Sequence, residues 1–395
     1  MKKIALITDS YKPVRNGVAI AVEQLRDYLT ATGYEVAIVA PAGQAAPSMG
    51  GTEFLLPSFR LPGIHPYVAI GRGFHSCLNA LRRFRPNVVH VHGWGPVSLL
   101  GIHFARSTAT PLVITWHTDV KAYLEYYRFM KPLLIFWHQV ARMICSSPDL
   151  GRQANTSDSF TVALLSTADL VVAPSYKIAK KLRELPLDTP IRIVPVGVDP
   201  VVPSVYSSES TLKIRGPMLL YVGRISPEKG IDLLLDAYDI VRICRPNATL
   251  VLAGDYRSGR GIRRRLRRAQ NLILTGELGP DDLGNLYARA DLFVFPSLTD
   301  TQGLVLHEAA HAGLPLVLVD EKLQSLVADK RNTTLCLPDP VALAVALMST
   351  LDRRQHGNWA AQANRVGKAL AARHSIERQG AKLTILYHQV LKGYL

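Results

Sequence analysis

The chain has 395 residues, of which 48% are apolar and 19% charged. At roughly 100–200 residues per domain, this length predicts two domains with separate cores. The composition excludes a disordered, collagen-like or disulfide-stapled chain. Its cysteines are far apart, at Cys77, Cys145, Cys244 and Cys336. This spacing offers no zinc-ribbon pair and predicts reduced thiols in a cytoplasm. No run approaches ~18 apolar residues, so no membrane span is expected.

Lysine and arginine outnumber aspartate and glutamate by 46 to 31, which gives a net charge of +15. This surplus favours anionic partners such as phosphates, nucleic acid or an acidic bilayer, although a surface kept soluble by arginine explains it equally well. Residues 1–10 place charge and a hydroxyl where a signal peptide needs apolar residues, which predicts a first strand there instead.

Short apolar runs alternate with amphipathic stretches along the chain. Strands are expected at residues 4–8, 36–39, 88–92, 112–116, 170–173 and 192–196, and after residue 217 at 218–222, 249–253, 272–275, 292–295 and 315–319. Helices are expected at 18–32, 231–244 and 304–312, with 341–394 mostly helical. This alternation is typical of parallel sheets covered by helices on both faces.

The sequence therefore predicts an α/β protein of two tandem Rossmann-like, doubly wound domains that face each other across a cleft. We place the N-terminal domain in residues 1–200, a Pro- and Ser-rich linker in 201–216 and the C-terminal domain in 217–375. A last helix, 376–395, is expected to return to the N-terminal domain. Ligands of such sheets bind beyond the carboxyl ends of the strands, so motifs there are candidate site residues.

The most informative motif follows the strand expected at 292–295. A polar turn carries Asp300, a helix begins at about Gly303, and Glu308 lies inside that helix. The free N–H groups of the first turn suit a phosphate, and the two carboxylates can hold hydroxyls at separate points of one ligand. Alternatively, Asp300 only caps the helix and Glu308 forms a surface ion pair.

A second motif, at residues 222–230, leaves the strand expected at 218–222. Arg224 offers a planar fork of donors and Lys229 a compact ammonium. Two such cations beside a helix N-terminus can hold a diphosphate without a metal. In the alternative, Lys229 pairs with Glu228 or Asp232 on the surface.

Two further segments follow strands in the first half of the chain. The loop at 12–17 ends in Gly17, where the backbone can approach a ligand closely. Residues 115–119 place His117 and Asp119 at the carboxyl end of a buried strand. A lone histidine is also commonly a structural residue with satisfied hydrogen bonds.

Residues 307–311 match the HExxH pattern of zinc hydrolases, with His307, Glu308 and His311 as the matching residues. The helix is short and ends at Gly313, and no third ligand follows at a usual spacing. Zinc hydrolysis is therefore kept only as a remote alternative.

Together these motifs resemble the family-4 glycosyltransferases of GT-B architecture. The resemblance covers nearly the whole chain and is specific at 223–230, at Asp300–Glu308 (the acidic-x7-Glu signature) and at 312–315. It implies a retaining enzyme that moves a hexose from a UDP- or GDP-sugar to an acceptor hydroxyl. It implies no metal or other cofactor.

The resemblance also implies residue roles. Lys229 and Arg224 would hold the diphosphate, Glu308 the ribose hydroxyls and Asp300 the sugar hydroxyls. The implied donor-binding set is Gly17, Arg224, Lys229, Gly276, Glu277, Asp300, Gly303, Leu304, Val305 and Glu308. The implied catalytic set is His117, Asp300, Arg224 and Lys229, and the acceptor side has Asn16, His117 and Asp119.

The acceptor is expected to be a lipid, a polyol or a glycoside. Residues 121–143 mix aromatic and basic side chains, as in a helix that lies on anionic lipid, although a core-facing helix fits equally well. Residues 145–160 are interpreted as an insertion on the acceptor side, and 320–325 depart from the family pattern that faces the donor. The arginines at 263–268 predict a solvated helix face, and no nucleic acid is expected.

The protein is expected in the cytoplasm, either free or attached peripherally to the inner face of the membrane. Besides the zinc hydrolase, two other functions remain open. A sugar phosphorylase of the same architecture would release sugar 1-phosphate. A non-enzymatic basic protein would bind nucleic acid or membrane in a salt-dependent way.

Overall fold

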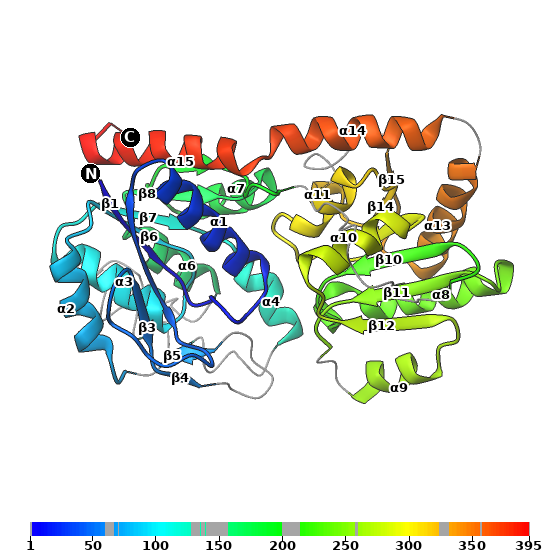
Figure 1. Ribbon diagram of the computed structural model, residues 1–395, viewed down its shortest axis with the longest axis horizontal. Coiled ribbons are helices and arrows are strands. Elements are labelled where there is room, and N and C mark those ends of the chain that lie inside the picture. The colour runs from blue at the N-terminus through cyan, green and yellow to red at the C-terminus, as the bar shows by residue number, and fades with distance from the viewer. Residues whose placement is uncertain are drawn as a thin grey trace. The chain divides into compact units, whose positions relative to one another are not determined.

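The computed structural model describes residues 2–59, 67–69, 71–127, 135, 139, 157–199, 214–256, 260–323, 332–355 and 358–394. The chain divides into two compact units. Unit 1 contains Met1–Gly197 and Ile376–Leu395, and unit 2 contains Val198–Ser375 (Figure 1). Of the linker expected at 201–216, only residues 214–216 lie within the described part.

Unit 1 contains a seven-stranded parallel sheet in the order β3-β2-β1-β6-β7-β8-β9. Its strands are β1 (Lys3–Ile7), β2 (Glu35–Pro41), β3 (Glu53–Leu56), β6 (Val88–Val91), β7 (Leu112–Thr115), β8 (Leu170–Ala173) and β9 (Ile191–Ile193). Its helices are α1 (Gly17–Ala31), α2 (Phe74–Phe84), α3 (Pro96–Ser107), α4 (Val120–Tyr126), α6 (Ser157–Leu165), α7 (Tyr176–Arg183) and α15 (Ile376–Lys392). A small antiparallel pair joins β4 (Ser58–Phe59) and β5 (Val68–Ala69).

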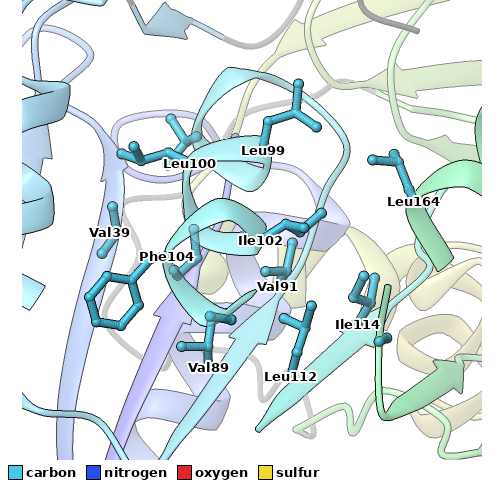
Figure 2. Close-up of a cluster of buried hydrophobic side chains, with 14 of the residues drawn as sticks. Val39, Val89, Val91, Leu99, Leu100, Ile102, Phe104, Leu112, Ile114 and Leu164 are labelled. Atoms are coloured by element: carbon cyan, nitrogen blue, oxygen red, sulfur yellow. The ribbon is translucent and has the colours of Figure 1, made fainter. Parts of the chain in front are cut away.

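Both faces of this sheet are buried, because helices pack against each of them. Successive side chains of a strand point to opposite faces and therefore enter different cores. In β1, Ala5 and Ile7 join the core that includes α3, whereas Ile4 and Leu6 join the core formed with α1 and α15. Figure 2 shows α3 packed over β6 in the first of these cores, with Ile102 close to Val91. The near-continuous apolar runs of these strands are explained by this double burial.

The C-terminal helix α15 packs against α1 within unit 1. It buries Leu383, Leu386 and Tyr387 in the same core as Leu25 of α1. At Gly380 a Cβ atom would lie 2.2 Å from the ring of Tyr28, so this close helix approach requires glycine.

Unit 2 contains a six-stranded parallel sheet in the order β12-β11-β10-β13-β14-β15. Its strands are β10 (Met218–Val222), β11 (Thr249–Ala253), β12 (Leu272–Gly276), β13 (Leu292–Phe295), β14 (Leu316–Leu318) and β15 (Thr333–Leu335). Its helices are η2 (Pro227–Lys229), α8 (Ile231–Cys244), α9 (Arg260–Arg268), α10 (Pro280–Arg289), α11 (Leu304–His311), α13 (Pro340–Gln355) and α14 (Trp359–Arg373).

Helices cover both faces of this sheet as well, with α8, α9 and α13 in one core and α10 and α11 in the other. The predicted class of two doubly wound, parallel-sheet α/β domains is confirmed. In each sheet the strand order reverses at one point, between β1 and β6 in unit 1 and between β10 and β13 in unit 2. Such switch points are where open α/β sheets bind ligands.

Three segments singled out in the sequence are described only in part. Of residues 121–143, the described helix α4 ends at Tyr126 and buries Leu124 in the core, and nearly all the rest lies outside the described residues. Residues 145–156 also lie outside, and 157–160 begin α6. Of 320–325, the described part reaches Leu323. Among the helices described, none is both long and apolar enough to cross a membrane.

Candidate functional site

A lysine and an aspartate meet at the switch point of unit 2. Lys229 follows β10 and Asp300 follows β13, and these strands are neighbours in the sheet. Lys229 Nζ donates to Asp300 Oδ1 over 2.6 Å, and the side chains are only 15% and 17% exposed. The structure therefore joins two residues that the sequence predicted for one site, although they are 71 positions apart.

The two loops that carry this pair are in direct contact. Gly230 has φ 71°, and a Cβ atom there would lie 2.3 Å from the carbonyl oxygen of Pro296, so only glycine fits. Thr299 Oγ1 donates to the carbonyl oxygen of Glu228 over 2.9 Å. These contacts hold the backbones of the two loops together, and the Lys229–Asp300 hydrogen bond joins their side chains.

Arg224 is oriented by a buried glutamate. Its guanidinium lies 3.3 Å from Glu228 Oε1, and Glu228 is 1% exposed whereas the arginine side chain is 36% exposed. Ser226 Oγ donates to the same carboxylate over 2.7 Å. The alternative in which Lys229 pairs with Glu228 or Asp232 on the surface is wrong, because Lys229 pairs with Asp300.

The start of α11 keeps its backbone donors available. Gly303 is the N-cap residue with φ 71°, and as a glycine it has no side chain of its own to cap the helix. The hydrogen bond described for Asp300 Oδ1 is with Lys229, and the alternative that Asp300 caps this helix stays a prediction. Leu304 and Val305 belong to the first turn, whose N–H groups have no partner within the helix.

Glu308 lies inside α11 and faces a tyrosine. Tyr287 Oη of α10 donates to Glu308 Oε2 over 2.8 Å. Burial raises the pKa of Glu308, and the Tyr287 hydrogen bond opposes that shift. The alternative of a surface ion pair for Glu308 is wrong, because its described partner is a buried phenol.

Gly276 and Glu277 lie at the carboxyl end of β12. Gly276 has φ 73°, and its carbonyl accepts from Gly254 N over 2.8 Å. Glu277 is exposed. The structure places both residues at the same edge of the sheet as Lys229, but it brings neither into a described contact with that lysine.

In unit 1, His117 is partly exposed and lies next to two buried histidines, His92 and His90. His92 Nδ1 lies 3.0 Å from His117 Nε2, and the two rings stack with centroids 5.3 Å apart. The next ring, His90, lies 4.0 Å from His92 and contacts Thr115 Oγ1 (2.7 Å) and Tyr387 Oη (2.6 Å). Burial lowers the pKa of His117 to about 4 and that of His90 to about 3, and it lowers the pKa of His92 well below its usual range. All three are therefore neutral near pH 7.

The residues expected on the acceptor side serve local structure. Asn16 Oδ1 accepts from Val18 N and Ala19 N over 3.1 and 2.9 Å, so this side chain caps α1, which begins at the exposed Gly17. Asp119 accepts from the backbone of α4 and pairs with Lys181 of α7. Neither contact tests the predicted acceptor role.

Two family models match most of the chain. Residues 15–202 match "Glycosyltransferase Family 4" and residues 216–353 match "Glycosyl transferases group 1". This chain belongs to the family-4 glycosyltransferases of GT-B architecture.

Similar proteins agree with this assignment. An alpha-monoglucosyldiacylglycerol synthase of Streptococcus pneumoniae is 26% identical over 90% of this chain and 80% of its own length. A GDP-mannose-dependent alpha-mannosyltransferase of Mycolicibacterium smegmatis is 27% identical over 90% of both chains. The fold is also that of Anabaena HepE, solved with UDP-glucose, at a TM-score of 0.71 and 16% identity over 98% of this chain and all of that one.

The HExxH residues of the glycosyltransferase do not converge. His307 is buried against the ring of His374, with centroids 4.8 Å apart, and Glu308 faces Tyr287. Among the described residues, no three His, Cys, Asp or Glu side chains form a group that could hold a metal ion. The zinc hydrolase alternative therefore has no support in the described geometry.

Sequence reasoning missed three residues of these clusters. His92 orients His117, Glu228 orients Arg224, and Tyr287 contacts Glu308. His92 could have been predicted from the sequence, because residues two positions apart in a strand point to the same face. This pattern would place His90 and His92 side by side on one face of the sheet. No local pattern marks Tyr287, whose partner is 21 positions away.

The lowered pKa values of His90, His92 and His117 predict that the folded glycosyltransferase loses stability as the pH falls. These histidines are neutral when folded but take up protons near pH 6.5 when unfolded, so the unfolded state binds more protons as the pH falls below 6.5. The free energy of unfolding should fall by about 1.4 kcal/mol per pH unit for each such histidine. Urea titrations at pH 7 and pH 5 measure this slope, and equal stabilities at the two values would contradict it.

Proposed function

We propose that this glycosyltransferase is a retaining, metal-independent hexosyltransferase. It takes a hexose from a UDP- or GDP-sugar and attaches it to the hydroxyl of a lipid, polyol or glycoside acceptor. The relative named for diacylglycerol supports a lipid acceptor, and the relative named for GDP-mannose supports a GDP-sugar donor. The HepE complex with UDP-glucose leaves UDP-sugars as the other donor class.

The observation that carries this proposal is the Lys229–Asp300 pair. Removing an ammonium and a carboxylate from water is costly, so a largely buried Lys–Asp pair is weak evidence for a stabilising role. Its burial therefore favours a role in ligand binding. The pair lies at the switch point of the sheet, where a diphosphate would contact Lys229 and the sugar hydroxyls would contact Asp300. Arg224, held by Glu228, would supply the second cation.

The proposed chemistry needs charge stabilisation at the leaving group. The bond between the anomeric carbon and the diphosphate oxygen breaks, and the new bond forms to the acceptor oxygen on the same face of the sugar. The departing phosphate oxygen takes the acceptor proton, so charge and atoms balance without a protein nucleophile. Lys229, Arg224 and the first-turn N–H groups of α11 would stabilise the growing charge. Glu308 would hold the ribose hydroxyls.

The test is sugar transfer measured in the presence of EDTA. Purified chain is incubated with UDP- or GDP-hexose and a diacylglycerol, polyol or glycoside acceptor, and proton NMR gives the anomeric configuration of the product. Retained configuration and an undiminished rate are expected. Inverted product, or loss of the rate with chelator, would contradict the proposal. Release of sugar 1-phosphate from phosphate and a glycoside would favour the phosphorylase instead.

His92 is proposed as a positioning residue for His117. Within the described part of the chain, the buried Nε2 of His92 has no hydrogen-bond partner, so a proton there would be an unsatisfied donor. The proton therefore belongs on Nδ1 of His92, which donates to Nε2 of His117 and leaves the His117 proton on Nδ1.

Replacing His92 with phenylalanine removes that donor, and asparagine restores an N–H close to the Nδ1 position. We expect His92→Phe to lower kcat about tenfold with little change in donor KM, and His92→Asn to recover most of the rate. Thermal melting of both variants serves as the control for packing. Equal kcat values in the two variants at equal melting temperature would exclude the positioning role.

A further inference from the structure

Helix α9 turns most of its arginines away from the protein. Ile262 and Leu266 are 5% and 4% exposed and pack in the core with α8. Arg265 lies on the same side and pairs with Asp232 and Asp236 of α8 over 3.4 and 2.6 Å. Four further arginines are exposed and form what we term the α9 arginine face: Arg263, Arg264, Arg267 and Arg268. In Figure 1 this helix lies at the foot of unit 2, outside β12.

The α9 arginine face is a concentrated and unneutralised charge. Among the described residues, none of its four members forms an ion pair with a carboxylate. All four line one hollow of about 330 Å³. Arginines four positions apart on a helix repel each other, so this face lowers the stability of α9 unless an anion occupies it.

The chemistry of this face fits phospholipid better than nucleic acid. Surfaces that bind single strands stack bases on aromatic rings between the cations. Here the neighbouring aromatic, Tyr256, is covered by the Arg263 guanidinium, which lies 5.7 Å from the ring centre. An anionic bilayer requires only cations that reach one plane of phosphates, and the i, i+1, i+4 and i+5 positions of this face share one side of the helix.

We propose that the α9 arginine face docks unit 2 onto an anionic phospholipid surface. The apolar side of α9 is already used by the core, so the contact is electrostatic and the helix does not insert. The inference goes beyond the proposed function and does not depend on it, because it concerns binding to a surface and not sugar transfer.

The test is sedimentation of the full chain with lipid vesicles. Vesicles containing phosphatidylglycerol should bind the protein, and pure phosphatidylcholine vesicles should not. Each arginine near an anionic leaflet increases the membrane-binding constant by a factor of about five. The R264Q/R268Q variant should therefore bind the vesicles about 25-fold more weakly. Raising the ionic strength from about 0.1 M to 1 M, which shortens the screening length to about 3 Å, should release the protein.

The matched control is R82Q/R83Q, which removes the same charge from the exposed side of α2 in unit 1. It should bind vesicles as the wild type does, and circular dichroism should show that both variants are folded. Equal vesicle affinity of R264Q/R268Q and its control would overturn the proposal. So would tight binding of a short single-stranded RNA that R264Q/R268Q abolishes while vesicle binding remains unchanged.

Discussion

Replacing Glu308 with glutamine should leave the protein at least as stable at neutral pH and remove most of its donor binding. Burial raises the pKa of this carboxyl group, so its ionised form destabilises the folded state at every pH above the unfolded value near 4.5. Glutamine removes that charge and keeps an oxygen that can accept from Tyr287. The ribose hydroxyls would lose a charged acceptor, which should weaken donor binding about 10- to 100-fold.

Thermal melting and calorimetric titration with UDP and GDP measure the two effects separately. Tyr287→Phe is the matched variant, because it removes the hydrogen bond that lowers the pKa of Glu308. Its donor affinity should therefore begin to fall at a higher pH on acidification than that of the wild type. A Glu308→Gln variant that melts normally and binds donor with full affinity would exclude the ribose role.

The second large effect is expected at Lys229. The Lys229→Met variant leaves Asp300 largely buried without its counter-charge, so it should lose both stability and turnover. Loss of one positioned cation beside a leaving group is expected to lower kcat at least about 100-fold. Initial rates of sugar transfer and urea unfolding measure these losses.

A double variant separates the two losses. Lys229→Met combined with Asp300→Asn removes both charges, so stability should return toward that of the wild type while turnover stays low. Lys368→Met removes an exposed lysine of α14 and should change neither quantity. Recovery of turnover in the double variant would show that the pair only supports the fold.

Much of the fold could be predicted because its central strands are uninterrupted apolar runs that are buried on both faces. The ranges expected for β10, β11, β13 and α8 agree with the structure residue for residue. By contrast, β3 and β15 were not predicted. Each is an edge strand of four or three residues, and β3 begins with a partly exposed glutamate, so neither shows the apolar pattern of a central strand.

The candidate site could be predicted as a set of residues but not as a set of contacts. The positions after strand ends predicted Lys229 and Asp300, because parallel strands end at one edge of a sheet. Glu308 was predicted from the helix that follows Asp300. The pairing of Lys229 with Asp300 depends on the order of β10 and β13 in the sheet, which no local pattern contains. The same holds for His92, whose partner follows the next strand of its sheet.

The central claim is that two side-chain cations and the start of α11 stabilise the departing diphosphate without a metal ion. The most direct measurement is a crystal structure of the chain with UDP or GDP bound in the presence of Mg²⁺. We expect the terminal phosphate against Lys229 Nζ and the Arg224 guanidinium, with no cation between them. A diphosphate that is held through a divalent ion, or that lies away from both side chains, would contradict the account.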